Sequence, residues 1–237
     1  MPGRFSGLDG QAPPRVVLEQ LSDTTFRLKE GFRYVDPTRK LDLTIRPEDL
    51  PATDLASVPW FLRWFVPAYG RHSLAALLHD YLLGKGEDRE PPIARDAADE
   101  IFLEALGALG VPRVRRHLMG VAVSLETRLS LGGRSRLRMR FWLVASLLGT
   151  GVLLLSIVTG PLWMVLGALL APVLGAFLWW PQFRTGLIAG YGSAILGPPS
   201  VMVALSYLVY WISEVVLGAS EERRQPPTLG ADRDERP

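Results

Sequence analysis

A histidine followed directly by an aspartate, His79-Asp80, lies in an apolar stretch that predicts a helix over residues 71–83. Apolar residues at helical spacing put His79 in the middle of the core-facing stripe. A second predicted helix, over 92–109, has Asp99 as the only acid of its apolar stripe. A buried carboxylate needs a partner, and so does the second nitrogen of a buried histidine. We therefore expect His79 and Asp99 to meet across the two helices.

Two interpretations of this pair are open. In a hydrolase, His79 would activate water as a general base, and Asp99 would hold the imidazole in the correct tautomer. In the other interpretation, the pair is a core hydrogen bond that locks two helices together, because ionic networks in cores also perturb buried groups. The residue types alone do not choose between catalysis and structure.

A second polar cluster, TDLASVP at 53–59, precedes the histidine. One interpretation makes Asp54 an oxygen ligand of a divalent cation, such as calcium, that it shares with Asp80, because carboxylates bind hard cations. The plainer interpretation is a turn or helix start, with Ser57 as the cap and Pro59 in the first turn. A nucleophilic role for Ser57 lacks the strand–elbow–helix context that such serines need.

The composition divides the 237 residues into two parts. Residues 141–183 and 185–213 contain no charged side chain, and each run exceeds the roughly 18 apolar residues that indicate a membrane span. Residues 1–140 carry most of the charged side chains. The chain has no cysteine, which excludes disulfides and thiolate metal sites.

The front part has the pattern of a small α+β domain over residues 15–130. Strands are expected at 15–19, 25–29, 32–36 and 41–45, and helices at 71–83, 92–109 and 112–129. Residues 46–70 contain several prolines and predict an ordered loop. Residues 1–14 are rich in glycine and proline without an apolar core, which predicts a disordered lead-in and not a signal peptide.

The back part predicts membrane helices behind a basic linker at 131–140. Spans are expected at 141–158, 162–180 and 198–217, with a re-entrant or interfacial piece at 186–197 and a disordered tail at 219–237. Pro198-Pro199 divides the last apolar run, and the alternative is one kinked, tilted helix. The sequence thus predicts a small cytoplasmic α+β domain followed by an α-helical transmembrane region of about three spans.

Arginines are concentrated next to the first predicted span. They are Arg113, Arg115, Arg116 and Arg128 on the third helix, and Arg134, Arg136, Arg138 and Arg140 in the linker. Arginine beside a span marks the cytoplasmic side, which predicts a multi-pass protein of the cytoplasmic (inner) membrane with its soluble domain in the cytoplasm. We expect these side chains to face anionic lipid headgroups, and we expect no nucleic acid because no aromatic residues alternate with them. His72, beside Arg71 at a helix start, is expected to be solvated.

Four motifs in order resemble a known family. They are T-D-L-A-S-V-P, G-R-H-S-L-A-A-L-L-H-D-Y-L, A-R-D-A-A-D-E-I-F and G-V-P, within roughly residues 40–125. They resemble the phage- and bacteria-associated family called domain of unknown function 1353. The resemblance implies a small domain without an assigned activity and without membrane helices, so the back half would be a fused anchor or would indicate a different role.

A weaker, local likeness is to the helix pair of phospholipase A2. In that family a His-Asp pair on one helix supplies the base and a calcium ligand, and an aspartate on a second helix orients the histidine. His79, Asp80 and Asp99 fit these roles in order. The glycine-rich calcium loop and the disulfides of that family are absent from this chain.

Two hypotheses follow from the sequence. In the first, the cytoplasmic domain is a metal-assisted hydrolase that acts at the membrane surface. In the second, the chain is a non-catalytic membrane-anchored adaptor of phage or prophage origin, with a structural His–Asp pair and another membrane protein as its partner. Dependence on a divalent cation discriminates them, because only the hydrolase needs a cation near Asp80.

Overall fold

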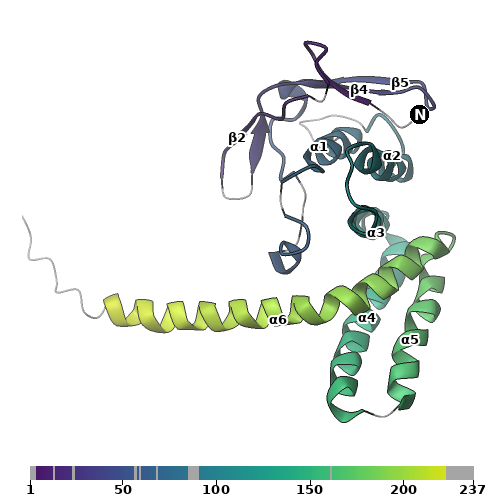
Figure 1. Ribbon diagram of the computed structural model, residues 1–237, viewed down its shortest axis with the longest axis vertical. Helices are drawn as coiled ribbons and strands as arrows, with labels where there is room; N and C mark the ends of the chain where they lie inside the picture. Colours follow the sequence, from purple (N-terminus) through teal and green to yellow (C-terminus); the bar gives the residue numbers. More distant parts are fainter. Residues whose placement is uncertain are drawn as a thin grey trace, which may run out of the picture.

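The computed structural model describes residues 4–222 apart from 13, 23, 24, 56, 57, 59, 68, 85–90 and 161. Ser57 and the ends of the two segments expected to be disordered, 1–3 and 223–237, lie outside the described residues. The chain forms a front domain of strands and three helices, and below it a group of three further helices (Figure 1). Short strands followed by helices confirm the predicted α+β order of the front domain.

Two small antiparallel sheets form one layer of the front domain. The first has the order β1-β4-β5, with β1 at Arg4–Gly7, β4 at Phe32–Asp36 and β5 at Leu41–Ile45, and the second pairs β2, Leu18–Gln20, with β3, Phe26–Leu28. In β4 alternate residues are buried, as expected for a strand with one face on a core. Phe32 and Tyr34 supply that face.

Strand β1 corrects the prediction of a disordered lead-in. Phe5 is buried, and its ring centre lies 6.0 Å from that of Phe32 and 5.0 Å from that of Tyr34. Residues 4–7 pair in register with residues 32–35 of β4. One aromatic side chain and a sheet edge are enough to order this segment, although its composition is rich in glycine.

Three helices follow the strands: the first two lie against the sheets, and the third packs on the second, farther from the sheets (Figure 1). They are α1 at Ser73–Leu82, α2 at Arg95–Ala108 and α3 at Arg113–Ser130. Every residue of α1 is buried. Gly84 and Gly110, which follow α1 and α2, have φ values of 69° and 70°, the left-handed conformation that glycine adopts beyond helix ends. The predicted ends of these two helices, at residues 83 and 109, are within one residue of the observed ends.

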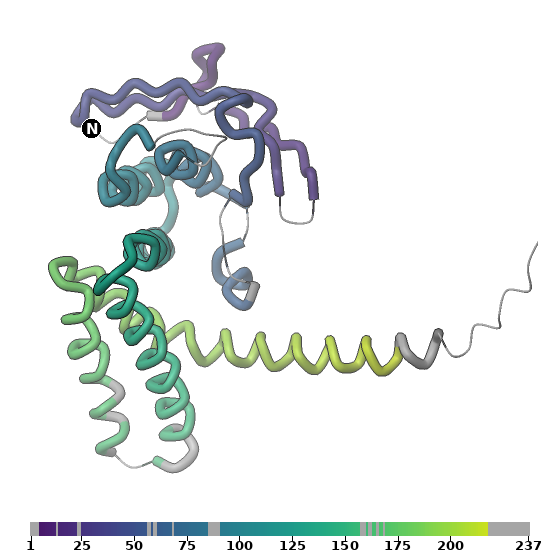
Figure 2. The backbone as a smooth tube through the Cα atoms, turned by 180° about the vertical axis from the view of Figure 1, so that it is seen from behind, coloured from purple at the N-terminus to yellow at the C-terminus, as the bar shows by residue number. Residues whose placement is uncertain are grey.

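The lower group consists of α4, Gly133–Thr159, α5, Leu162–Ala176, the short 3-10 helix η3, Phe177–Trp179, and α6, Phe183–Glu222. Helices α4 and α5 form an antiparallel hairpin, and α6 runs across it and continues beyond it (Figure 2). The expected linker at 131–140 is mostly helical instead, because α4 begins at Gly133. Arginine, leucine and methionine favour helix, and the positive φ of Gly132 supplies the turn from α3.

The last apolar run forms one helix, with Pro198 and Pro199 inside it. The division into a piece at 186–197 and a span at 198–217 is therefore wrong as a description of the secondary structure, and the alternative of a single kinked helix holds. Proline removes a backbone donor and bends a helix without ending it when the surrounding turns are packed. Helix α6 changes direction where it passes α4 (Figure 1).

Two helical stretches in the described part of the chain are long and apolar enough to cross a membrane, Gly133–Ser156 and Phe183–Leu217. A shorter apolar stretch, Leu169–Trp179, lies on α5 and η3. In the most apolar window of the first stretch 22% of residues are buried, and in that of the second only 6%. Most of this apolar surface is thus uncovered by protein.

Candidate functional site

His79 of α1 and Asp99 of α2 form a hydrogen bond of 2.9 Å between Nε2 and Oδ1. Both are buried, at 5% and 7% exposure. The predicted meeting of the two side chains is confirmed. An ionised carboxylate only accepts hydrogen bonds, so the imidazole donates its Nε2–H to Asp99. The ring of Phe102 packs at a tilt against the imidazole, with 5.0 Å between centroids.

The burial of His79 limits the chemistry of this pair. A general base must lie within hydrogen-bond reach of the proton that it takes. At 5% exposure, and on a helix that is buried along its whole length, the imidazole of His79 is closed off from solvent. In this arrangement the pair can join α1 to α2, and a substrate would need the surrounding elements to open.

Asp80 accepts a hydrogen bond from Thr53, a residue for which the sequence predicted no role. Thr53 Oγ1 donates a hydrogen bond of 2.7 Å to Oδ2 of Asp80, and both residues are buried. The same hydroxyl accepts a bond of 2.9 Å from the backbone N–H of Leu55. Thr53 thus ties the loop to α1. The only signal in the sequence was a threonine next to Asp54 in an apolar setting, and the residue types favoured Asp54 as the functional side chain.

Among the described residues, Asp54 and Asp80 do not form the donor set expected for a shared cation. Asp54 is exposed, whereas Asp80 is 3% exposed and bonded to Thr53. Among the described residues, no group of three or more His, Cys, Asp or Glu side chains could hold a metal ion. The residues around Asp80 therefore do not fit a calcium site, and we derive no step through a metal.

His72 corrects another expectation. It is 3% exposed at the residue before α1, where we expected a solvated side chain. The helix begins at Ser73, and the backbone N–H of Gly70 donates a bond of 2.9 Å to the Ser73 hydroxyl. This turn folds His72 inward, next to Gly70. The predicted helix began at residue 71, two residues before the observed start at Ser73. His72 was therefore expected inside the helix, whereas it precedes α1.

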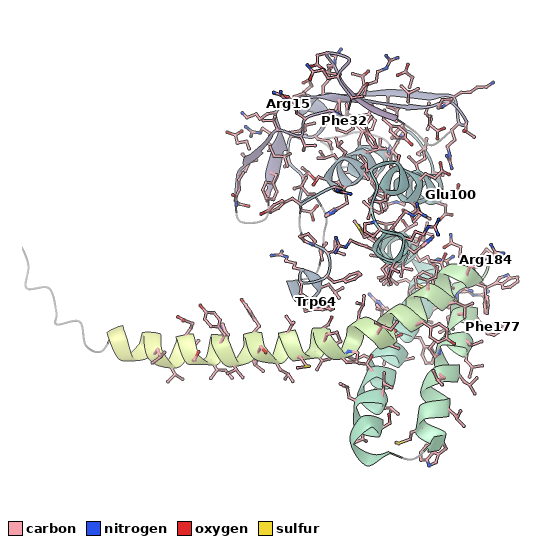
Figure 3. All side chains as sticks on the ribbon, viewed as in Figure 1. Arg15, Phe32, Trp64, Glu100, Phe177 and Arg184 are labelled. Carbon is pink, nitrogen blue, oxygen red and sulfur yellow. The ribbon has the colours of Figure 1, made fainter. Side chains whose placement is uncertain are left out.

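The expected membrane-facing arginines divide into exposed and covered members. Exposed side chains are those of Arg113, Arg134, Arg136 and Arg140, and partly buried ones are those of Arg115, Arg116 and Arg138. Arg115 lies over the ring of Phe65, with its guanidinium carbon 5.6 Å from the ring centre. Trp64, beside it, donates a 3.4 Å hydrogen bond from Nε1 to Ser200 of α6, so this loop lies between the front domain and α6 (Figure 3).

Arg128 does not face the surface as expected. It is 7% exposed, and its guanidinium carbon lies 5.5 Å from the ring centre of Trp179. Burial lowers the pKa of its guanidinium, and the charge of Arg138 lowers it further. The aromatic face of Trp179 compensates part of the cost of burying this cation. No pattern in the sequence linked these two residues, which are far apart in the chain.

The fold defines a small α+β domain built onto an apolar helical part, with a buried His–Asp pair in its core. Residues 26–123 match the family described as protein of unknown function (DUF1353), which confirms the resemblance carried by the four sequence motifs. The match contains His79, Asp80 and Asp99 and leaves α4, α5 and α6 outside. No curated protein and no solved structure matches the chain.

Proposed function

We propose that this chain is a multi-pass membrane protein that holds its DUF1353 domain at the cytoplasmic membrane surface as a non-catalytic adaptor. The uncovered apolar surface of α4 and α6 supports this proposal. The core helix of a soluble protein would be mostly buried, whereas only 6% of the most apolar window of α6 is. Water around so much apolar surface is costly, and a bilayer removes that cost.

The charge distribution supports a cytoplasmic front domain. Arg134, Arg136 and Arg140 are exposed at the start of α4, and the apolar residues of the helix follow them. Positive residues next to a span are retained on the cytoplasmic side. From Phe141 to Thr159, α4 has a length of about 28 Å at ~1.5 Å per residue, close to the ~30 Å hydrocarbon core.

The burial of the His79–Asp99 pair favours the adaptor over the hydrolase. His79 is 5% exposed, and its hydrogen bond to Asp99 joins two core helices. An adaptor needs a rigid domain and a membrane anchor, and both are consistent with this arrangement. Its partner would be another membrane protein, which contacts the exposed apolar face of the helices or the front domain.

Reporter fusions to the full chain test the topology. A reporter of cytoplasmic location should be active when inserted at Gly132, and a reporter of the opposite side should be active when inserted at Gly160. Extraction of membranes at alkaline pH should leave the protein in the pellet. Release into the supernatant, or the same side for both fusions, would refute the membrane proposal.

A hydrolase that uses the His79–Asp99 pair is the second candidate, and the 2.9 Å contact between these two side chains favours it. It requires α1 to become accessible at the membrane surface. Incubation of the protein with ester lipids in anionic vesicles and with calcium or another divalent cation tests it. Activity that His79→Gln abolishes without a change in the thermal midpoint would favour the hydrolase over the adaptor.

A further inference from the structure

Helices α3 and α4 and the short helix η3 meet at a cluster of cationic and aromatic side chains. Arg128 from the end of α3 stacks on Trp179 of η3, 5.5 Å from its ring centre. Arg138 from α4 donates a 3.3 Å hydrogen bond from Nη2 to the backbone oxygen of Trp180. The backbone N–H of Gln182 donates a 2.8 Å bond to the oxygen of Trp179. These contacts define the arginine–tryptophan cluster.

Polar atoms of this cluster are buried without a hydrogen-bond partner in the described part of the chain. They are Nε of Arg128, Nε of Arg138, Nε1 of Trp179 and Oε1 of Gln182. Three of the four are N–H donors, and the amide of Gln182 can present either its oxygen or its nitrogen. The cluster therefore has more donors than the described protein atoms satisfy. Each buried donor without an acceptor costs free energy.

The cluster also lacks negative charge. Within the residues described, no acid lies at ion-pair distance from Arg128 or Arg138. Asp96 and Asp99 act on Arg128 only from beyond ion-pair distance, and Asp99 is already bonded to His79. Two buried or half-buried guanidiniums without a carboxylate form a site for an anion with several acceptor oxygens.

We propose that the arginine–tryptophan cluster binds the phosphate of an anionic phospholipid headgroup. A phosphate offers acceptor oxygens to the planar guanidinium edges and supplies the missing charge. The proposal rests on the proposed membrane location, which determines the source of the phosphate. Trp142 and Trp179 pack edge to face at this end of the helical hairpin, 5.3 Å between centroids, and tryptophan is enriched at the depth of the headgroups. Arg184, the second residue of α6, lies at the same end of the helical hairpin (Figure 3).

The test uses the full chain, purified in an uncharged detergent. Its thermal midpoint is measured with added phosphatidylglycerol, phosphatidylcholine or inorganic phosphate at equal ionic strength. The variants are Arg138→Gln and, as a matched control, Arg134→Gln, which removes the same charge from an exposed position one turn earlier on α4. Arg128→Lys keeps the charge but removes Nε and the forked geometry.

We expect phosphatidylglycerol to raise the midpoint of the wild type and of Arg134→Gln, and phosphatidylcholine and inorganic phosphate to leave it unchanged. The apparent affinity for phosphatidylglycerol should fall about tenfold in Arg138→Gln, the effect of one lost charge-assisted hydrogen bond. Arg128→Lys should show a similar loss despite its unchanged charge.

Three outcomes would overturn the proposal. An equal shift with phosphatidylcholine would mean that the headgroup charge is not recognised, and an equal loss in Arg134→Gln would mean that diffuse surface charge attracts the lipid. A full shift with inorganic phosphate would assign the cluster to free phosphate instead. Alkaline extraction tests the membrane anchor separately, so a lipid-specific shift in detergent and a failed anchor are distinguishable results.

Discussion

His79 Nε2 and Asp99 Oδ1 lie 2.9 Å apart, although the two residues are 20 positions apart in the chain. Each is a polar residue within the apolar stripe of its own helix, and both are buried. The bond therefore fixes α1 against α2 at a defined register. Loss of either partner would leave the other polar group buried and unsatisfied.

Asp99→Ala should lower the free energy of unfolding by about 1–3 kcal/mol, because the Nε2–H of His79 loses its acceptor. Denaturant titration of the full chain in detergent, followed by near-ultraviolet circular dichroism, measures this change. Glu100→Ala is the control, because Glu100 is exposed and pairs with Arg39 at 3.5 Å on the surface. It should cost at most about 1 kcal/mol. An equal effect of both variants would contradict a buried tie.

Thr53→Ala should also destabilise the front domain, by about 1–3 kcal/mol, because its hydroxyl both donates to Asp80 and accepts from Leu55. Thr53→Ser keeps the hydroxyl and should retain most of that stability. The same denaturant titration compares them. If serine were as damaging as alanine, the methyl group of Thr53 would be the important part and the hydrogen bonds would not.

The front domain should lose stability in acid through Asp36. Burial alone would raise the pKa of this carboxyl, but hydrogen bonds from the Arg39 side chain and from two backbone amides hold it below its usual range. Because the folded pKa is lower than the unfolded one, the contribution is present above about pH 4 and is lost as the pH falls through the folded value.

Asp36→Asn should therefore flatten the dependence of the thermal midpoint on pH below about pH 4. The matched control is Asp42→Asn. Asp42 also has a lowered pKa, from its hydrogen bond to Arg33, but both side chains of that pair are about half exposed. Solvent screening makes such a pair weak, so the control should keep the acid sensitivity of the wild type.

Tyr34 gives a prediction at the opposite end of the pH scale. Burial, followed by the charges of Asp36 and Glu104, raises its pKa to about 12, and its hydroxyl has no hydrogen-bond partner among the described residues. A raised folded pKa stabilises the fold below the ordinary value of about 10, and the benefit is lost as the pH rises through the folded value.

Tyr34→Phe should remove this alkaline loss and should leave stability at neutral pH unchanged or raise it by up to about 1 kcal/mol, because an unpaired buried hydroxyl disappears. Thermal midpoints between pH 7 and pH 12 measure both effects. A neutral-pH loss above about 1 kcal/mol would mean that the hydroxyl has a stabilising contact.

The periodicity of the sequence was sufficient for the elements that pack locally. Strands β4 and β5 have the predicted bounds of 32–36 and 41–45, and the three front helices lie within the predicted ranges or extend one residue past them. The His79–Asp99 contact was also predictable, because each residue is the exception in an apolar stripe. Alternating and helical patterns record such one-sided burial directly.

Contacts between distant segments were not predictable in this way. Strand β1 depends on its pairing with β4, about 28 residues later, and Arg128 depends on the face of Trp179, which lies after α5 in the chain. Neither leaves a periodic signal in its own segment. Thr53 was missed for a similar reason, since only the packing of the loop on α1 selects it over the neighbouring Asp54.

Gly186 and Gly190 of α6 are four residues apart, a spacing of small residues that allows close packing of helices. A Cβ atom on Gly190 would lie 3.0 Å from Cα and 3.2 Å from the backbone oxygen of Pro172 on α5. Backbone atoms cannot move aside as a flexible side chain can. Gly190→Ala should therefore push α5 and α6 apart.

We expect Gly190→Ala to reduce stability by about 1–3 kcal/mol, the usual cost of overpacking, and to lower the thermal midpoint of the full chain in detergent. Gly149→Ala on α4 is the control, since a Cβ atom there meets nothing within 4 Å. Alanine is the better helix former, so the control should be neutral or more stable by about 0.5–1 kcal/mol. If both variants were equally stable, α5 and α6 would not pack through Gly190, and the close approach of the two helices would be refuted.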